Sequence, residues 1–178
     1  DGLRCVGAVD GEGVCRDVSA RPGEGAACGA DRPCGAELVC AGLAYGPQGQ
    51  CVPAWMQGVF VGEAPRDIPD ASADGVQVGA VVRGLATVPT DVYLTLAIEH
   101  TWRGDLRVTL TDPNGQTVVV HDRAGGSADD LRLDRVPVRG FSMDDTVNGT
   151  WTLTVQDLAR QDVGALRGWS LDVTSRWD

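Results

Sequence analysis

The sequence predicts an all-β protein, an antiparallel β-sandwich preceded by a small disulfide-rich module. Three observations lead to this prediction. All six cysteines lie before residue 52, apolar residues alternate with polar ones from Ile68 onward, and no segment of ten or more residues shows a helical stripe. We therefore expect a disulfide-rich six-cysteine module at residues 1–52, a linker or docking strand at 53–66, and the sandwich at 67–178.

The first 52 residues are rich in Gly, Ala, Pro and Cys and show little apolar periodicity. A segment of this size cannot build a sizeable hydrophobic core, so cross-links are expected to stabilise it. The candidate disulfide cysteines are Cys5, Cys15, Cys28, Cys34, Cys40 and Cys51. Six cysteines allow many pairings, among which the sequence does not choose. Our working assignment is Cys5 with Cys15, Cys28 with Cys40, and Cys34 with Cys51.

A metal site is the alternative interpretation of these cysteines. None of them has Cys-x2-Cys spacing, and no histidine lies before residue 100. Structural zinc sites are built from such closely spaced pairs. Disulfides are therefore the expected chemistry.

The sandwich is predicted from strands in which every second residue is apolar, the pattern of a half-buried strand. The alternation is clearest at residues 92–98, 106–110, 151–155 and 169–173 and weaker at 76–82, 117–121 and 131–138. Turn signals at residues 112–115 and 148–149 separate several of these segments. Trp151 and Trp169 alternate with Leu and Val, so we expect both in the core.

Composition limits the partners and the location. The chain has 15 basic and 25 acidic residues and a net charge of -10, which disfavours nucleic acid. It contains no apolar run of 18 residues that would predict a transmembrane segment. An even number of clustered cysteines points to an oxidising compartment, so we expect a secreted or cell-surface protein. All basic residues are arginine, which is typical of a GC-rich gene and suggests a bacterial source.

Five motifs then resemble, in order, a known family. They are Ile68-Pro69-Asp70, the segments 98–106 and 110–117, and the segments 149–157 and 164–171. Together they resemble the P domain, also called the Homo B domain, of kexin- and furin-like proprotein convertases and of bacterial secreted subtilisin-like proteases, over residues about 58–178. The resemblance implies a jelly-roll-like β-sandwich.

The same resemblance implies that the chain is an accessory domain without catalytic residues. Convertases use a separate Ser-His-Asp domain, and nothing in this sequence resembles it. Only His100 and His121 could act as a general base, and both fall in or beside predicted strands. We expect His100 to hydrogen-bond a neighbouring loop.

Calcium is the cofactor that the resemblance suggests, because some P domains carry it. The candidate ligands are Asp70, Asp74, Asp105, Asp157 and Asp162, which fall in predicted loops. The alternative is that these residues form turns, a role that aspartate often takes.

The leading functional hypothesis is a non-catalytic secreted accessory or binding module. It would stabilise or assist a subtilisin-like protease domain, or recognise an extracellular protein or glycan. One alternative is a fragment of a secreted subtilisin-like serine endopeptidase whose catalytic domain lies outside this chain. A second is a carbohydrate- or protein-binding surface lipoprotein, for which Trp102 in a loop could serve as a platform.

Overall fold

The computed structural model describes residues 3–9, 12–17, 21–43 and 48–178. The chain divides into two compact units, Asp1–Ala54 and Trp55–Asp178. No helix in the described ranges is long and apolar enough to cross a membrane.

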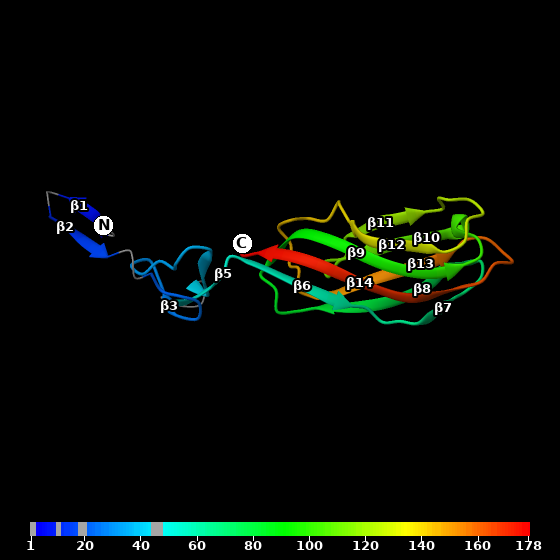
Figure 1. The fold of residues 1–178 in the computed structure, drawn as a ribbon, viewed down its shortest axis with the longest axis horizontal. Coiled ribbons are helices and arrows are strands. Elements are labelled where there is room, and N and C mark those ends of the chain that lie inside the picture. Colours follow the sequence, from blue (N-terminus) through cyan, green and yellow to red (C-terminus); the bar gives the residue numbers. More distant parts are fainter. Residues whose placement is uncertain (1–2, 10–11, 18–20, 44–47) are drawn as a thin grey trace. The chain divides into compact units, whose positions relative to one another are not determined.

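The first unit contains a hairpin and a three-stranded sheet (Figure 1). The strands are β1 (Leu3–Val9), β2 (Glu12–Asp17), β3 (Ala27–Cys28), β4 (Leu38–Ala41) and β5 (Gly49–Pro53). The sheet order is β3-β5-β4. Disulfides join Cys28 to Cys40 and Cys34 to Cys51, which confirms these two predicted pairings.

The third predicted pairing concerns β1 and β2. Their antiparallel register places the backbone of Cys5 opposite that of Cys15. Both side chains lie outside the described part of the structure, so this bridge stays a prediction.

The second unit is a sandwich of two antiparallel sheets (Figure 1). Its strands are β6 (Trp55–Val61), β7 (Arg66–Ile68), β8 (Ser72–Val82), β9 (Val88–His100), β10 (Leu106–Thr111), β11 (Thr117–Asp122), β12 (Leu131–Pro137), β13 (Gly149–Asp157) and β14 (Gly164–Arg176). One sheet has the order β11-β10-β13-β8. The other has the order β12-β9-β14-β6, with β7 also paired to β14.

The predicted alternation explains how the two sheets pack. Leu94, Leu96 and Ile98 of β9 point inward and are almost inaccessible to solvent. Trp151 and Trp169 are buried in the same core, as predicted. The Trp151 ring packs edge-on against Phe141, with ring centroids 4.9 Å apart. The all-β sandwich predicted from the sequence is therefore confirmed.

The strand β14 is the centre of the five-stranded sheet. It pairs with β9 along one edge and with both β7 and β6 along the other. Between β6 and β7 the chain passes so close to Trp169 that a side chain at Gly62 would overlap the indole ring. The sequence predicted either a linker or a docking strand for segment 53–66. In the structure this segment contributes the edge strand β6.

The Asn148-Gly149 turn is anchored to a distant loop by its side chain. The amide oxygen of Asn148 accepts a hydrogen bond from the Leu85 N–H at 3.1 Å. Its amide nitrogen donates to the carbonyls of Leu85 and Ala86, at 3.0 and 2.9 Å. The turn before β13 is therefore fixed to the loop before β9.

Candidate functional site

Loops and strand ends gather polar side chains at one end of the sandwich. The register pairs His100, at the end of β9, with Gly164, at the start of β14. It also pairs Asp157, at the end of β13, with Leu106 in β10. A short 3-10 helix, Arg103–Asp105, connects β9 to β10 at this end. Antiparallel pairing thus brings residues distant in sequence to one place.

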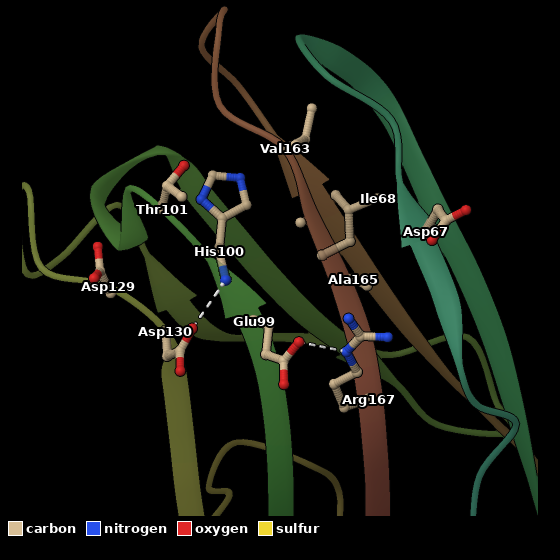
Figure 2. Close-up of a pocket in the computed structure, with 11 residues that line it drawn as sticks. Asp67, Ile68, Glu99, His100, Thr101, Asp129, Asp130, Val163, Ala165 and Arg167 are labelled. Carbon is tan, nitrogen blue, oxygen red and sulfur yellow. Dashed lines mark hydrogen bonds and ion pairs between the residues drawn. The ribbon is translucent and has the colours of Figure 1, made fainter.

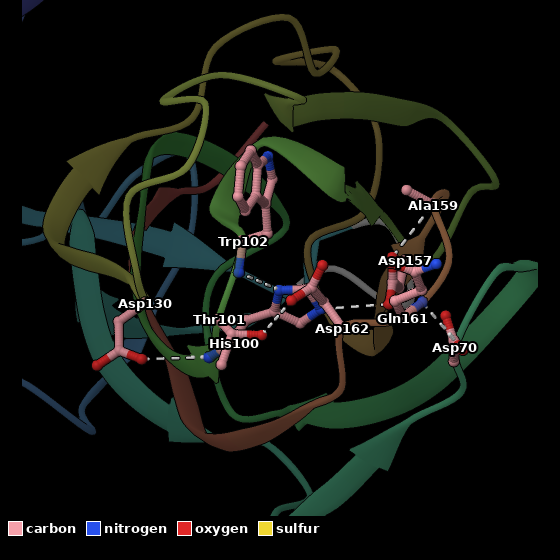
Figure 3. A network of polar contacts seen from close by, with 9 residues as sticks. All are labelled: Asp70, His100, Thr101, Trp102, Asp130, Asp157, Ala159, Gln161 and Asp162. Carbon is pink, nitrogen blue, oxygen red and sulfur yellow. Dashed lines mark hydrogen bonds and ion pairs between the residues drawn. The ribbon is translucent and has the colours of Figure 1, made fainter.

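A buried histidine and aspartate form the centre of this network (Figure 3). His100 Nε2 lies 3.2 Å from Asp157 Oδ2, and neither side chain is accessible to solvent. The backbone N–H of Trp102 donates to His100 Nδ1 at 3.1 Å. Because Nδ1 accepts a hydrogen bond, the ring proton is assigned to Nε2, which donates it to Asp157. The ring is therefore neutral in this arrangement.

The His100 ring fits because β14 begins with glycine. A Cβ atom at Gly164 would overlap the imidazole of His100 and the carbonyl oxygen of Glu99. The absence of a side chain at Gly164 therefore leaves room for the buried ring.

Both histidines form hydrogen bonds with neighbouring groups. His100 has both ring nitrogens engaged, one with Asp157 and one with Trp102. His121 Nε2 lies 3.3 Å from the carbonyl oxygen of Arg103, which accepts its hydrogen bond. Among the residues that the structure describes, no hydroxyl group is hydrogen-bonded to either imidazole, as the serine of a Ser-His-Asp triad would be.

Three of the five predicted calcium ligands lie in the network. Asp157 Oδ1 accepts from the Ala159 N–H at 3.2 Å. Asp162 accepts from the Thr101 hydroxyl at 2.6 Å. Asp70 accepts from the Gln161 N–H at 3.4 Å. These bonds order the turn that follows β13.

The other two predicted ligands, Asp105 and Asp74, contribute no side-chain hydrogen bond to this network, although the Asp105 carbonyl oxygen accepts from the Leu158 N–H at 2.9 Å. Asp105 is buried in the 3-10 helix, and Asp74 is exposed in β8. In the described part of the chain, the sulfur atoms of Cys28, Cys34 and Cys40 are the one set of three candidate ligand atoms within 4.8 Å of one another, and these cysteines form disulfides. The five aspartates therefore do not form a cage of three carboxylates.

An open depression of about 690 Å³ lies beside the network (Figure 2). Apolar groups of Ile68, Val163 and Ala165 contribute to its lining. Its polar lining comes mainly from Asp67, Glu99, Asp129, Asp130 and Arg167. Glu99 and Arg167 form an ion pair at 2.7 Å. Sequence reasoning missed Asp67 and Glu99, although the alternation that turns Ile68 and Ile98 inward turns their neighbours outward.

A second polar group lies on the solvent side of the same sheet. Asp172 of β14 accepts hydrogen bonds from Gln57 at 2.7 Å and from Arg135 at 2.8 Å. The guanidinium of Arg135 also lies 3.9 Å from the ring centroid of Tyr93. The hydrogen bond from Gln57, followed by that from Arg135, lowers the pKa of Asp172, while the bond to Asp172 raises the pKa of Arg135.

Several known proteins are similar to this chain in sequence. Leupeptin-inactivating enzyme 1 of Streptomyces exfoliatus is 37% identical over 113 residues, 63% of this chain and 25% of that protein. A calcium-dependent protease of Nostoc sp. is 31% identical over 68% of this chain and 19% of that protein. A transglutaminase-activating metalloprotease of Streptomyces mobaraensis is 36% identical over 64% of this chain and 14% of that protein. The chain thus spans a quarter or less of these relatives.

A solved structure shares the sandwich. The Aeromonas sobria serine protease, solved in complex with its chaperone, matches with a TM-score of 0.54 and 17% identity, over 71% of this chain and 28% of that one. Residues 89–173 match the family model of the proprotein convertase P-domain. The β-sandwich of this chain therefore contains a region, residues 89–173, that is similar to the proprotein convertase P-domain.

Proposed function

We propose that this chain is a secreted, non-catalytic accessory module that stabilises or assists a protease. The match of residues 89–173 to the P domain, a non-catalytic domain of proteases, carries the proposal. The names of the three relatives support an association with proteolysis. The disulfides of the first unit support an oxidising, extracytoplasmic location.

The histidine environments support the absence of hydrolytic activity in this chain. His100 and Asp157 supply two of the residue types of a hydrolase triad, yet the remaining imidazole nitrogen accepts the Trp102 N–H. A general base needs a free nitrogen within reach of the hydroxyl it deprotonates. His121 is directed to a backbone carbonyl. Both imidazoles therefore have structural roles in this proposal.

The alternative is that the chain is a piece of a longer secreted protease. The small share of each relative that it spans favours this alternative. We expected a subtilisin-like serine endopeptidase, but one relative is named a metalloprotease. The class of protease is therefore left open in this proposal.

Two measurements test the accessory role. The purified chain should not hydrolyse a fluorogenic protein substrate, and sustained hydrolysis that copurifies with it would refute the non-catalytic assignment. The complete reading frame should encode or adjoin a protease. That protease, produced with and without residues 55–178, should lose activity faster on heating when the sandwich is missing. An unchanged half-life would remove the stabilising role.

Calcium binding is a further part of the proposal. It rests on the name of the Nostoc relative and on the carboxylates of Asp70 and Asp162 beside the turn after β13. Calcium takes six to eight oxygen ligands and accepts main-chain carbonyls and water, so a site with few carboxylates is chemically reasonable. Millimolar calcium should raise the melting temperature, and a chelator should reverse the change. No response to either would exclude calcium.

A further inference from the structure

The depression owes its shape to a small residue between two acidic ones. In the five-stranded sheet the register pairs Ala165 with Asp67 of β7 on one side and with Glu99 of β9 on the other. Ile68, Ile98 and Leu166, the next residues along the three strands, point into the core. Asp67, Ala165 and Glu99 therefore share the solvent face of the sheet and form a row across it.

The row has more negative charge than its neighbours neutralise. Four carboxylates and one guanidinium line the depression, a formal sum of -3 with His100 neutral. Glu99 is paired with Arg167, and Asp130 is paired with Arg132 at 3.2 Å. Within the described residues, Asp67 and Asp129 take part in no ion pair. A basic residue at position 165 would have compensated the row, and alanine stands there instead.

The lining also suits an aliphatic stem. Val163 is 68% exposed at the rim, and the methyl group of Ala165 forms part of the floor. Lysine and arginine place apolar methylene groups along such surfaces while their charged ends remain hydrated. The volume of about 690 Å³ is within the range of ligand sites and exceeds what one side chain fills.

We propose that this depression binds an extended basic peptide segment, with an arginine or lysine side chain over Ala165 between Asp67 and Glu99. Charge complementarity selects this occupant, because an acidic or neutral segment would gain nothing from the row. The spacing of the carboxylates disfavours a single metal ion, since no three of their oxygens lie within 4.8 Å of one another. The proposal does not depend on the stabilising role proposed above.

The probe is a fluorescently labelled five-residue peptide that alternates valine with arginine, and the control probe carries glutamate in place of arginine. Anisotropy titrations use the whole chain. We expect saturable binding of the arginine peptide that weakens as ionic strength rises from about 0.01 to about 0.15 M. The glutamate peptide should not bind. Equal binding of both peptides, or no binding of either, would overturn the proposal.

Variants locate the binding. Ala165→Arg places a guanidinium between the two carboxylates and occupies the space above position 165, so the affinity for the arginine peptide should fall at least about tenfold. Asp67→Asn should lower it about two- to fivefold, the range expected for an exposed charge pair. Asp145→Asn, which removes an exposed carboxylate outside the depression, is the matched control and should bind like the parent chain.

Two outcomes would contradict this assignment. One is that Asp67→Asn binds the arginine peptide as tightly as the control variant does. If circular dichroism shows that Ala165→Arg does not fold, the test rests on Asp67→Asn. The other is that free spermidine competes as strongly as the unlabelled arginine peptide. That result would identify a small polyamine as the better ligand and would refute the peptide occupant.

Discussion

His100 and Asp157 face each other across the end of the sandwich, with Nε2 and Oδ2 3.2 Å apart and both side chains fully buried. Replacing Asp157 by alanine leaves the imidazole N–H without an acceptor. We expect a loss of about 2–4 kcal/mol in the free energy of unfolding, measured by urea denaturation. Asp157→Asn should cost less, because an amide oxygen can accept the same hydrogen bond. Equal losses for the two variants would argue against the assigned proton.

The side chain of Asn148 joins two segments through three hydrogen bonds. Asn148→Ala should therefore lower the free energy of unfolding by about 2–3 kcal/mol, near 1 kcal/mol for each lost bond. Asn148→Asp should be almost as harmful, because a carboxylate cannot donate to the carbonyls of Leu85 and Ala86. Chemical denaturation measures both. If Asn148→Asp left the free energy of unfolding unchanged, the two donated hydrogen bonds would contribute nothing to stability.

Asp172 should contribute to stability in a pH-dependent way. Its pKa in the folded protein lies below the ordinary value of 3.8, chiefly because Gln57 donates a hydrogen bond to the carboxylate. The contribution is complete above that ordinary value and is lost as the pH falls through the lowered pKa. Unfolding free energies measured across this acidic range should fall less steeply for Asp172→Asn than for the parent chain.

The partners of Asp172 provide the comparison for that experiment. Gln57→Leu and Arg135→Gln should each make the unfolding free energy fall less steeply with acid, because both side chains lower the pKa of Asp172. Asp145→Asn, which removes an exposed carboxylate, is the control and should leave the dependence of the unfolding free energy on pH unchanged. A slope equal to that of the parent chain in either variant would show that this partner does not lower the pKa of Asp172.

Reduction should affect the two units differently. The Cys34–Cys51 bridge spans a sequence separation of 17 residues, for which loop entropy predicts about 3 kcal/mol. All cysteines lie before residue 52, so the sandwich has no disulfide to lose. Under a thiol reductant, amide hydrogen exchange should accelerate in residues 21–43 and stay unchanged in residues 68–173. Acceleration in β9 or β14 would show that the sandwich depends on the first unit.

Alternation made the sandwich predictable because burial of one sheet face imposes a period of two on every strand that takes part. It failed to identify β7, because Arg66–Ile68 is too short for a period to be visible. The pairing of Cys28 with Cys40 and of Cys34 with Cys51 agreed with the working assignment, which the sequence alone did not determine.

The candidate site was less predictable than the fold. Asp157 was identified as a calcium candidate, yet its partner is His100, 57 residues earlier. Asp67 and Glu99 lie on either side of Ala165 only because of the register of β7 and β9 against β14. Such placements depend on which strands are neighbours, and local patterns do not encode that information.

The position of β14 has a consequence for how the domain is made. All strands that pair with it come earlier in the chain, and Trp55 of β6 pairs with Arg176 near the end of β14. As the polypeptide is synthesised, β6, β7 and β9 emerge before the strand that joins them. Pairings between such distant segments also slow folding. The five-stranded sheet can close only after its central strand is available, so the nascent domain spends this interval with apolar groups such as Phe60 uncovered.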